Sequence, residues 1–151
     1  MFKPSGKPAA AELDQMPAAV RGNPRPEDAA VHPIAVVDDD TWVRDSLRVL
    51  LETLGFEVVA HGSGAELLAD RRLHSVGCLI IDHHMPRMDG VELLSLLRGE
   101  GIDAPAILIT GRLDAAITSR AASIGGTAIL EKPFSTRRLI ELVHLSLGDG
   151  K

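Results

Sequence analysis

Residues 78–90 read CLIIDHHMPRMDG, a short continuous apolar run that ends at an acidic residue, Asp82. Strands buried on both faces of a parallel sheet have this character, and ligands of such sheets bind in the crevice beyond the carboxyl ends of the strands. Three further stretches place a polar residue directly after an apolar run: VVDDD at 36–40, ILITG at 107–111 and ILEKPF at 129–134. The sequence therefore predicts that these polar residues converge in space: Asp38, Asp39, Asp82, Thr110 and Lys132.

A strand followed by a helix recurs five times along the chain. Strands are expected near residues 34–38, 56–60, 77–82, 105–110 and 126–130, and helices near 41–54, 63–73, 89–98, 113–124 and 135–147. Short connections between alternating elements favour right-handed crossovers and a parallel sheet. The predicted fold is therefore α/β, a doubly wound five-stranded parallel sheet of flavodoxin-like order 2-1-3-4-5 with helices on both faces. We expect Asp40 and Thr41 to cap the first helix and Asp89 to cap the third, with Trp42 as a core or packing residue.

Composition divides the chain into an N-terminal arm, residues 1–32, and one domain, residues 33–151. The arm holds five of the nine prolines, with alanine, glycine and charged residues but no sustained apolar periodicity. Such a composition cannot repay the entropy of ordering, so we expect the arm to be disordered. A chain of 151 residues with 45% hydrophobic content is long enough for one packed core but too short for two ordinary domains.

Charge and hydropathy restrict the class of protein further. Four basic and four acidic residues balance in the arm, so the formal net charge of -5 belongs to residues 33–151, and an acidic domain is a poor nucleic-acid binder. No stretch has the apolar core of a signal peptide or the length of a membrane span. Cys78 lies in an apolar run and is expected to be a small core residue in a reducing compartment. We therefore expect a cytoplasmic protein with no membrane partner.

Three carboxylates at one strand-end cluster would repel one another unless a cation lies among them. Magnesium prefers oxygen ligands and accepts one or two carboxylates plus waters, so Asp39 and Asp82 are expected as direct ligands and Asp38 through water. The Lys132 ammonium is expected to pair with an anion that arrives later, and the Thr110 hydroxyl to contact the same anion. The residue types thus predict a site for Mg²⁺ and a phosphoryl group.

At these positions the chain resembles the receiver domains of two-component response regulators, over about residues 33–147. The resemblance implies that Asp82 is the phosphoacceptor for a histidine kinase or histidine phosphotransfer protein, and that Thr110 and Lys132 contact the phosphoryl oxygens. It also implies that Mg²⁺ is held by Asp38, Asp39, Asp82 and the backbone carbonyl of His84. The stretches VRDSLRVLLETLGF, ITGRLD and EKPF are most similar to receivers of the nitrogen-fixation regulator type, which usually carry a helix-turn-helix output domain.

Only Gly148 to Lys151 follow the last expected helix. We therefore expect a stand-alone receiver without a DNA-binding domain, a phosphoprotein of phosphorelay signalling whose output is binding to an unknown downstream protein. By the same resemblance it is a phosphoacceptor that assists its own phosphorylation and dephosphorylation, rather than an enzyme.

Two positions depart from the family pattern, and three other functions stay open. Ile129 stands three residues before Lys132, where the family usually has Tyr or Phe, and His84 stands two residues after Asp82, where a side chain is expected to tune phosphoryl lifetime. The alternatives are a phosphate reservoir or shuttle in a phosphorelay, a degenerate receiver that only binds partners, and a haloacid-dehalogenase-like phosphatase. The last would use Asp38 and Asp40 as nucleophile and acid and would leave Asp82 without a purpose.

Overall fold

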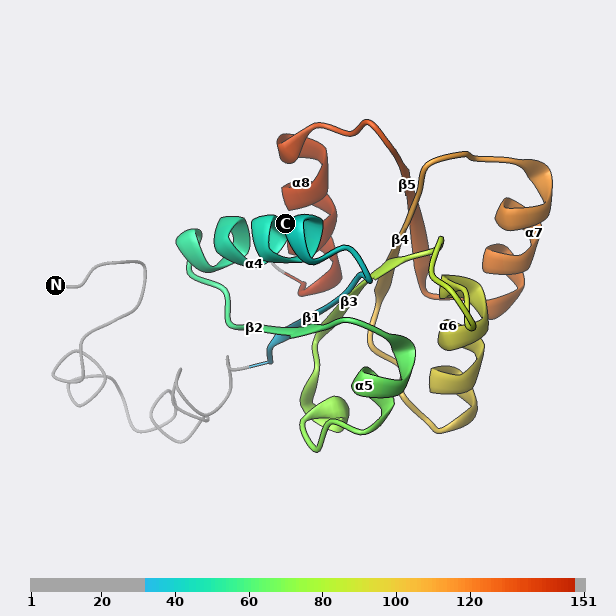
Figure 1. The fold of residues 1–151 in the computed structure, drawn as a ribbon, viewed down its shortest axis with the longest axis horizontal. Coiled ribbons are helices and arrows are strands. Elements are labelled where there is room, and N and C mark those ends of the chain that lie inside the picture. Colours follow the sequence, from blue (N-terminus) through green and yellow to red (C-terminus); the bar gives the residue numbers. More distant parts are fainter. Residues whose placement is uncertain (1–31, 149–151) are drawn as a thin grey trace, which may run out of the picture. The chain divides into compact units, whose positions relative to one another are not determined.

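The computed structural model describes residues 32–148, which form a parallel sheet of five strands in the order β2-β1-β3-β4-β5 (Figure 1). The strands are β1 Ile34–Val37, β2 Val58–His61, β3 Cys78–Asp82, β4 Ala106–Thr110 and β5 Thr127–Glu131. The predicted fold class and strand order are confirmed. The predicted arm, apart from His32, lies outside the described residues.

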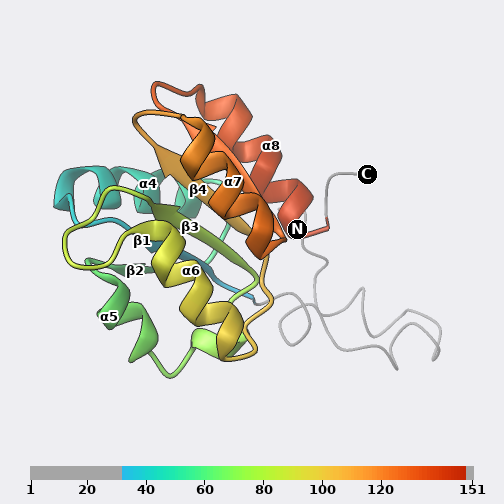
Figure 2. The same cartoon turned by 90° about the vertical axis from the view of Figure 1, so that its right-hand side faces the viewer.

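Helices cover both faces of the sheet, as Figures 1 and 2 show. They are α4 Thr41–Thr53, α5 Gly64–Leu68, α6 Gly90–Gly99, α7 Ala115–Ile124 and α8 Thr136–Ser146, with a short 3₁₀ turn, η1, at Leu73–Ser75. Alternate strand residues point to opposite faces, so the core has two parts. One lies between the sheet and α4 and α8, and the other between the sheet and α5, α6 and α7. Every residue of β1, β3 and β4 is buried, which explains their unbroken apolar sequence.

The strand register brings the carboxyl ends of β1 and β3 side by side. Val37 pairs with Ile81, so Asp38 and Asp82 follow at neighbouring positions of the two strands. The Asp38 amide donates to the carbonyl of His61 at 3.1 Å, which extends the ladder between β1 and β2 by one residue. The topological switch point, where ligands of such sheets bind, is therefore occupied by acidic residues.

Two expectations about local structure were wrong. The second helix was expected to reach residue 73, but α5 ends at Leu68. Two residues later, the Asp70 carboxylate accepts hydrogen bonds from His61 Nε2 at 2.7 Å and from the Arg72 amide at 2.8 Å. These tertiary and turn contacts compete with helix continuation. Trp42 is 81% exposed rather than in the core, because it lies on the first turn of α4, off the stripe formed by Leu47 and Leu51.

The helix caps follow the sequence more closely. The Asp40 carboxylate accepts from the amides of Trp42 at 2.9 Å and Val43 at 3.2 Å, so Asp40 is the N-cap of α4. Thr41 is instead the first helical residue. Asp89 caps α6 as expected, in a reciprocal pair with Glu92 in which each side chain accepts from the other's backbone amide at 2.8 Å.

Replacing Asp89 tests the strength of this cap. We expect Asp89→Ala to lower the free energy of unfolding by about 1–2 kcal/mol, because it leaves the Glu92 amide at the start of α6 without its partner. It also removes the contact of Asp89 with Arg120 of α7, at 3.4 Å. Urea unfolding measures the loss. The control is Asp103→Ala, which removes an exposed loop carboxylate and should change stability by less than about 0.5 kcal/mol; equal losses in the two variants would show that Asp89 stabilises α6 no more than any surface charge.

Candidate functional site

Three carboxylates gather at the carboxyl ends of β1 and β3. Asp38, Asp39 and Asp82 each place a carboxylate oxygen within 4.8 Å of the others, with Asp38 and Asp82 buried and Asp39 exposed. The sequence predicted this cluster from strand ends alone. Its exposed member leaves the cluster open to ions and to a partner from solvent.

The electrostatics of the cluster follow from its burial. Desolvation raises the pKa of Asp38 and of Asp82 above the usual range, and repulsion from neighbouring carboxylates raises both further. Other groups oppose this rise in pKa. The Lys132 ammonium lies close enough to lower the pKa of both carboxyls, the Asp40 amide donates to Asp38 Oδ1 at 2.9 Å, and the backbone amide and ring of His84 lower the pKa of Asp82. Since the pKa values stay raised despite Lys132, the cluster still favours added positive charge.

The donor set fits a hard divalent cation. Three carboxylate oxygens in one cluster, one of them on an exposed residue, suit Mg²⁺, which binds oxygen and keeps several of its waters. Asp38, Asp39 and Asp82 are the residues that could hold it. His84 lies beside them, since its backbone amide is 3.4 Å from Asp82 Oδ1. The ligand role of its carbonyl stays a prediction.

Thr110 and Lys132 end the neighbouring strands β4 and β5. Thr110 is fully buried as the last residue of β4, and its carbonyl accepts from the Lys132 amide at 2.8 Å, which extends the pairing of β4 with β5. The peptide bond between Lys132 and Pro133 is cis. The structure therefore brings all five predicted residues to one edge of the sheet.

One contact of the site was not predicted from the sequence. His84 places Nε2 at 2.8 Å from the Thr110 hydroxyl, although residue 84 belongs to the loop after β3 and residue 110 to the end of β4. The only sequence signal for it is that both residues follow or end neighbouring strands. Ile129, the other departure from the family pattern, is partly buried and packs on the core between the sheet and α5, α6 and α7.

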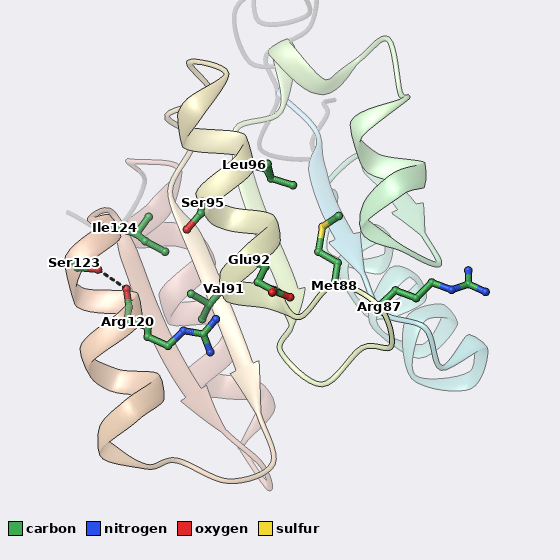
Figure 3. A pocket seen from close by; sticks show the side chains of 9 residues that line it. All are labelled: Arg87, Met88, Val91, Glu92, Ser95, Leu96, Arg120, Ser123 and Ile124. Carbon is green, nitrogen blue, oxygen red and sulfur yellow. Dashed lines mark hydrogen bonds between the residues drawn. The ribbon is translucent and has the colours of Figure 1, made fainter.

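A separate groove lies between α6 and α7 (Figure 3). Its volume is about 620 Å³, and it is lined by Val91 and Leu96 of α6 and by Arg120 and Ile124 of α7, among others. None of the five predicted site residues lines it. Because the buried carboxylates lie elsewhere, the chemistry belongs to the acidic cluster rather than to this groove.

A sheet of this order, with three carboxylates, a threonine and a lysine at its strand ends, defines a receiver-type signalling domain. The chain matches the response regulator receiver domain over residues 34–144 and belongs to that family. The family resemblance drawn from the sequence is confirmed. Receiver domains are signalling domains of two-component systems, so the interpretation as a phosphatase of another family is not supported.

Two curated relatives and one solved structure illustrate the similarity. The chain is 39% identical to the transcriptional regulatory protein FixJ of Azorhizobium caulinodans, over 77% of this chain and 55% of that protein. It is 35% identical to the C4-dicarboxylate transport transcriptional regulatory protein DctR of Rhodobacter capsulatus, over 72% of this chain and 56% of that protein. The crystal structure of FixJ-N superposes with a TM-score of 0.70 at 35% identity, covering 78% of this chain and 94% of that one.

These relatives correct the expected output. They are transcriptional regulatory proteins, and the chain spans about half of their length. The expectation of no DNA-binding domain, with an output that is protein binding alone, is therefore contradicted, whereas the expectation of a stand-alone receiver stays a prediction. That expectation rested on the few residues after the last expected helix and on the acidic net charge of residues 33–151. Between residues 32 and 148, no helix is long and apolar enough to cross a membrane.

Proposed function

We propose that this receiver accepts a phosphoryl group on Asp82 from a phosphohistidine of a histidine kinase or phosphotransfer protein, in a reaction that depends on Mg²⁺. The observation that carries the proposal is the buried Asp82 carboxylate, clustered with Asp38 and Asp39 and close to Lys132. Membership of the receiver family supports the same role.

The residues of the site have separate tasks in this transfer. An Asp82 oxygen attacks phosphorus, the bond from phosphorus to the donor imidazole breaks, and the imidazole nitrogen keeps the electron pair. Asp38, Asp39 and Asp82 would hold Mg²⁺, which would supply positive charge to the transferred group. Lys132 pairs with a phosphoryl oxygen, and Thr110 donates its hydroxyl proton to another. Phosphoryl transfer needs mainly such positioning and charge neutralisation.

Incubation with a small acyl phosphate, with and without Mg²⁺, tests the proposal. We expect one phosphoryl group per chain, only in the presence of Mg²⁺, and loss of the label in acid and in base, as for an acyl phosphate on a carboxylate. Turnover of organic phosphates without stable labelling would indicate a phosphatase. No labelling and no turnover would indicate a module that only binds partners, and either result would overturn the proposal.

The exposed carboxylate of Asp39 gives a sharp test of the metal site. We expect Asp39→Ala to weaken Mg²⁺ binding by about tenfold or more, since metal sites are sensitive even to the loss of outer partners. The Mg²⁺-dependent rise in thermal stability measures the affinity. Asp45→Ala is the control, because Asp45 is also an exposed aspartate, on α4, and pairs with Arg48 at 3.6 Å. Unchanged affinity in Asp39→Ala would remove Asp39 from the site.

A phosphoryl shuttle is the second candidate, and Ile129 is the observation that favours it. Its side chain is β-branched, packs on the core and has no ring to exchange between buried and exposed positions. A beryllium fluoride phosphoryl mimic distinguishes the two by NMR. Changes confined to residues around Asp82 support the shuttle, whereas changes that extend to residues 111–114 and α7 support a conformational response.

A further inference from the structure

The Thr110 hydroxyl is fully committed to partners in this structure. A hydroxyl has one proton to donate and two lone pairs to accept with. Thr110 Oγ1 donates to the Arg112 carbonyl at 3.0 Å and accepts from the Arg112 amide at 3.1 Å. His84 Nε2 lies 2.8 Å from the same oxygen, and with the hydroxyl proton on the Arg112 carbonyl the imidazole is the donor to the second lone pair. A phosphoryl oxygen can receive the hydroxyl proton only after this arrangement is broken.

Backbone contacts explain why His84 reaches Thr110. The His83 amide donates to the carbonyl of Ile109 at 2.8 Å, which continues the pairing of β3 with β4 one residue beyond Asp82. The carbonyl of His83 then accepts from the amides of Met85 at 3.1 Å and Gly90 at 3.0 Å, so the turn around residue 84 is fixed on both sides. His83 is buried, and its ring meets the His84 ring edge-on at 5.1 Å. The His84 imidazole is therefore held over the end of β4 by the fold.

From these contacts we infer that His84 is a positioning residue, which holds the Thr110 hydroxyl in its hydrogen bonds with Arg112. It thereby opposes the movement of that hydroxyl towards a phosphoryl group on Asp82. This inference rests on the proposed function and assigns a regulatory role to one side chain. Thr110 has no exposed surface, and the imidazole is one of the groups that cover its hydroxyl. His84 contacts Asp82 through its backbone amide, at 3.4 Å, and its ring acts on that carboxyl through charge alone.

The restraint extends to the segment between β4 and α7. Residues 111–114 join Thr110 to the first turn of α7, and the Leu113 amide donates to Glu131 Oε2 at 3.1 Å, at the end of β5. When the hydroxyl leaves Arg112, this segment loses one of its fixed points. His84 thereby stabilises the unphosphorylated arrangement of the segment through which phosphorylation is read out.

Two substitutions separate hydrogen bonding from bulk. Gln places its side-chain amide nitrogen as many bonds from Cα as Nε2 of histidine, whereas Asn is one bond too short. We expect His84→Asn to bind beryllium fluoride in the presence of Mg²⁺ about three- to tenfold more tightly than the parent, the worth of one hydrogen bond. His84→Gln should restore the parent affinity. In a Thr110→Val background, which lacks the hydroxyl, His84→Asn should have no further effect.

NMR of the unliganded protein supplies a readout that does not depend on phosphorylation. The Arg112 and Leu113 amide signals should shift in His84→Asn towards their beryllium fluoride positions and stay at the parent positions in His84→Gln. Unchanged Arg112 and Leu113 signals in His84→Asn would overturn the inference. Weaker beryllium fluoride binding by His84→Asn would overturn it too, because it would mean that the imidazole contacts the phosphoryl group directly. If the parent binds no beryllium fluoride, the proposed function fails, and the shifts in the unliganded protein still decide the role of His84.

Discussion

Asp82→Asn should abolish phosphoryl uptake from both a small acyl phosphate and a histidine kinase. The amide oxygen of Asn lacks the charge of a carboxylate and is a much weaker nucleophile, while its shape preserves the packing at the end of β3. Labelling with a radioactive donor measures the effect, and Asp45→Asn on the surface of α4 serves as the matched control that should label like the parent. A stoichiometric label on the Asp82→Asn protein would refute Asp82 as the acceptor.

The same variant should not be less stable than the parent, which separates loss of chemistry from loss of fold. Burial and neighbouring carboxylates raise the pKa of Asp82 above an unfolded value of about 3.9. A group with a raised folded pKa contributes its full stability below the unfolded pKa, and that contribution is lost as pH rises through the folded pKa. At neutral pH without divalent cations the Asp82 carboxylate therefore opposes folding. Asn carries no charge at this position, so the melting temperature of Asp82→Asn at neutral pH without divalent cations should be higher than that of the parent. A clearly lower melting temperature would contradict this electrostatic effect.

The sheet and the acidic cluster could be predicted because each leaves a local signature. A strand buried on both faces must be apolar throughout, and β3 is fully buried from Cys78 to Asp82. The change from apolar to polar at Asp38, Asp82 and Thr110 then marks the strand ends, and parallel topology places those ends at one edge. Strand order follows from the same alternation of elements, because short crossovers leave few topologies.

The parts that were missed depend on contacts between residues distant in sequence. Just after the end of α5, Asp70 forms a hydrogen bond with His61, nine residues earlier. Helical periodicity does not predict a contact of this kind. The hydrogen bond between His84 and Thr110 joins residues 26 apart, which the register of β3 and β4 brings together. Neither residue type predicts this contact. Trp42 was expected to be a core or packing residue, whereas its position on the surface of α4 leaves it exposed.

The importance of Gly90 is visible only in the packing around it. Gly90→Ala should lower the free energy of unfolding by about 2–3 kcal/mol, the usual cost of overfilling a close-packed site. A Cβ at Gly90 would lie 2.7 Å from Leu108 Cδ1, 2.8 Å from His83 Cα and 2.9 Å from the Asp82 carbonyl oxygen. The leucine methyl can turn away, but the two backbone atoms belong to the end of β3 and its continuation. The strand end must therefore shift, and with it the Asp82 carboxylate.

The matched control lies in the same helix. Gly99 ends α6, and a Cβ there meets nothing within 4 Å, so Gly99→Ala should leave stability unchanged or raise it by about 0.5–1 kcal/mol through helix propensity alone. Propensity favours alanine at both positions, so opposite signs in urea unfolding isolate the steric effect at Gly90. Phosphoryl uptake should slow in Gly90→Ala and stay at the parent rate in Gly99→Ala, since only the first moves Asp82. If the two variants were equally stable and equally fast, the end of β3 would have room to adjust, and Gly90 would not be what fixes the Asp82 carboxylate.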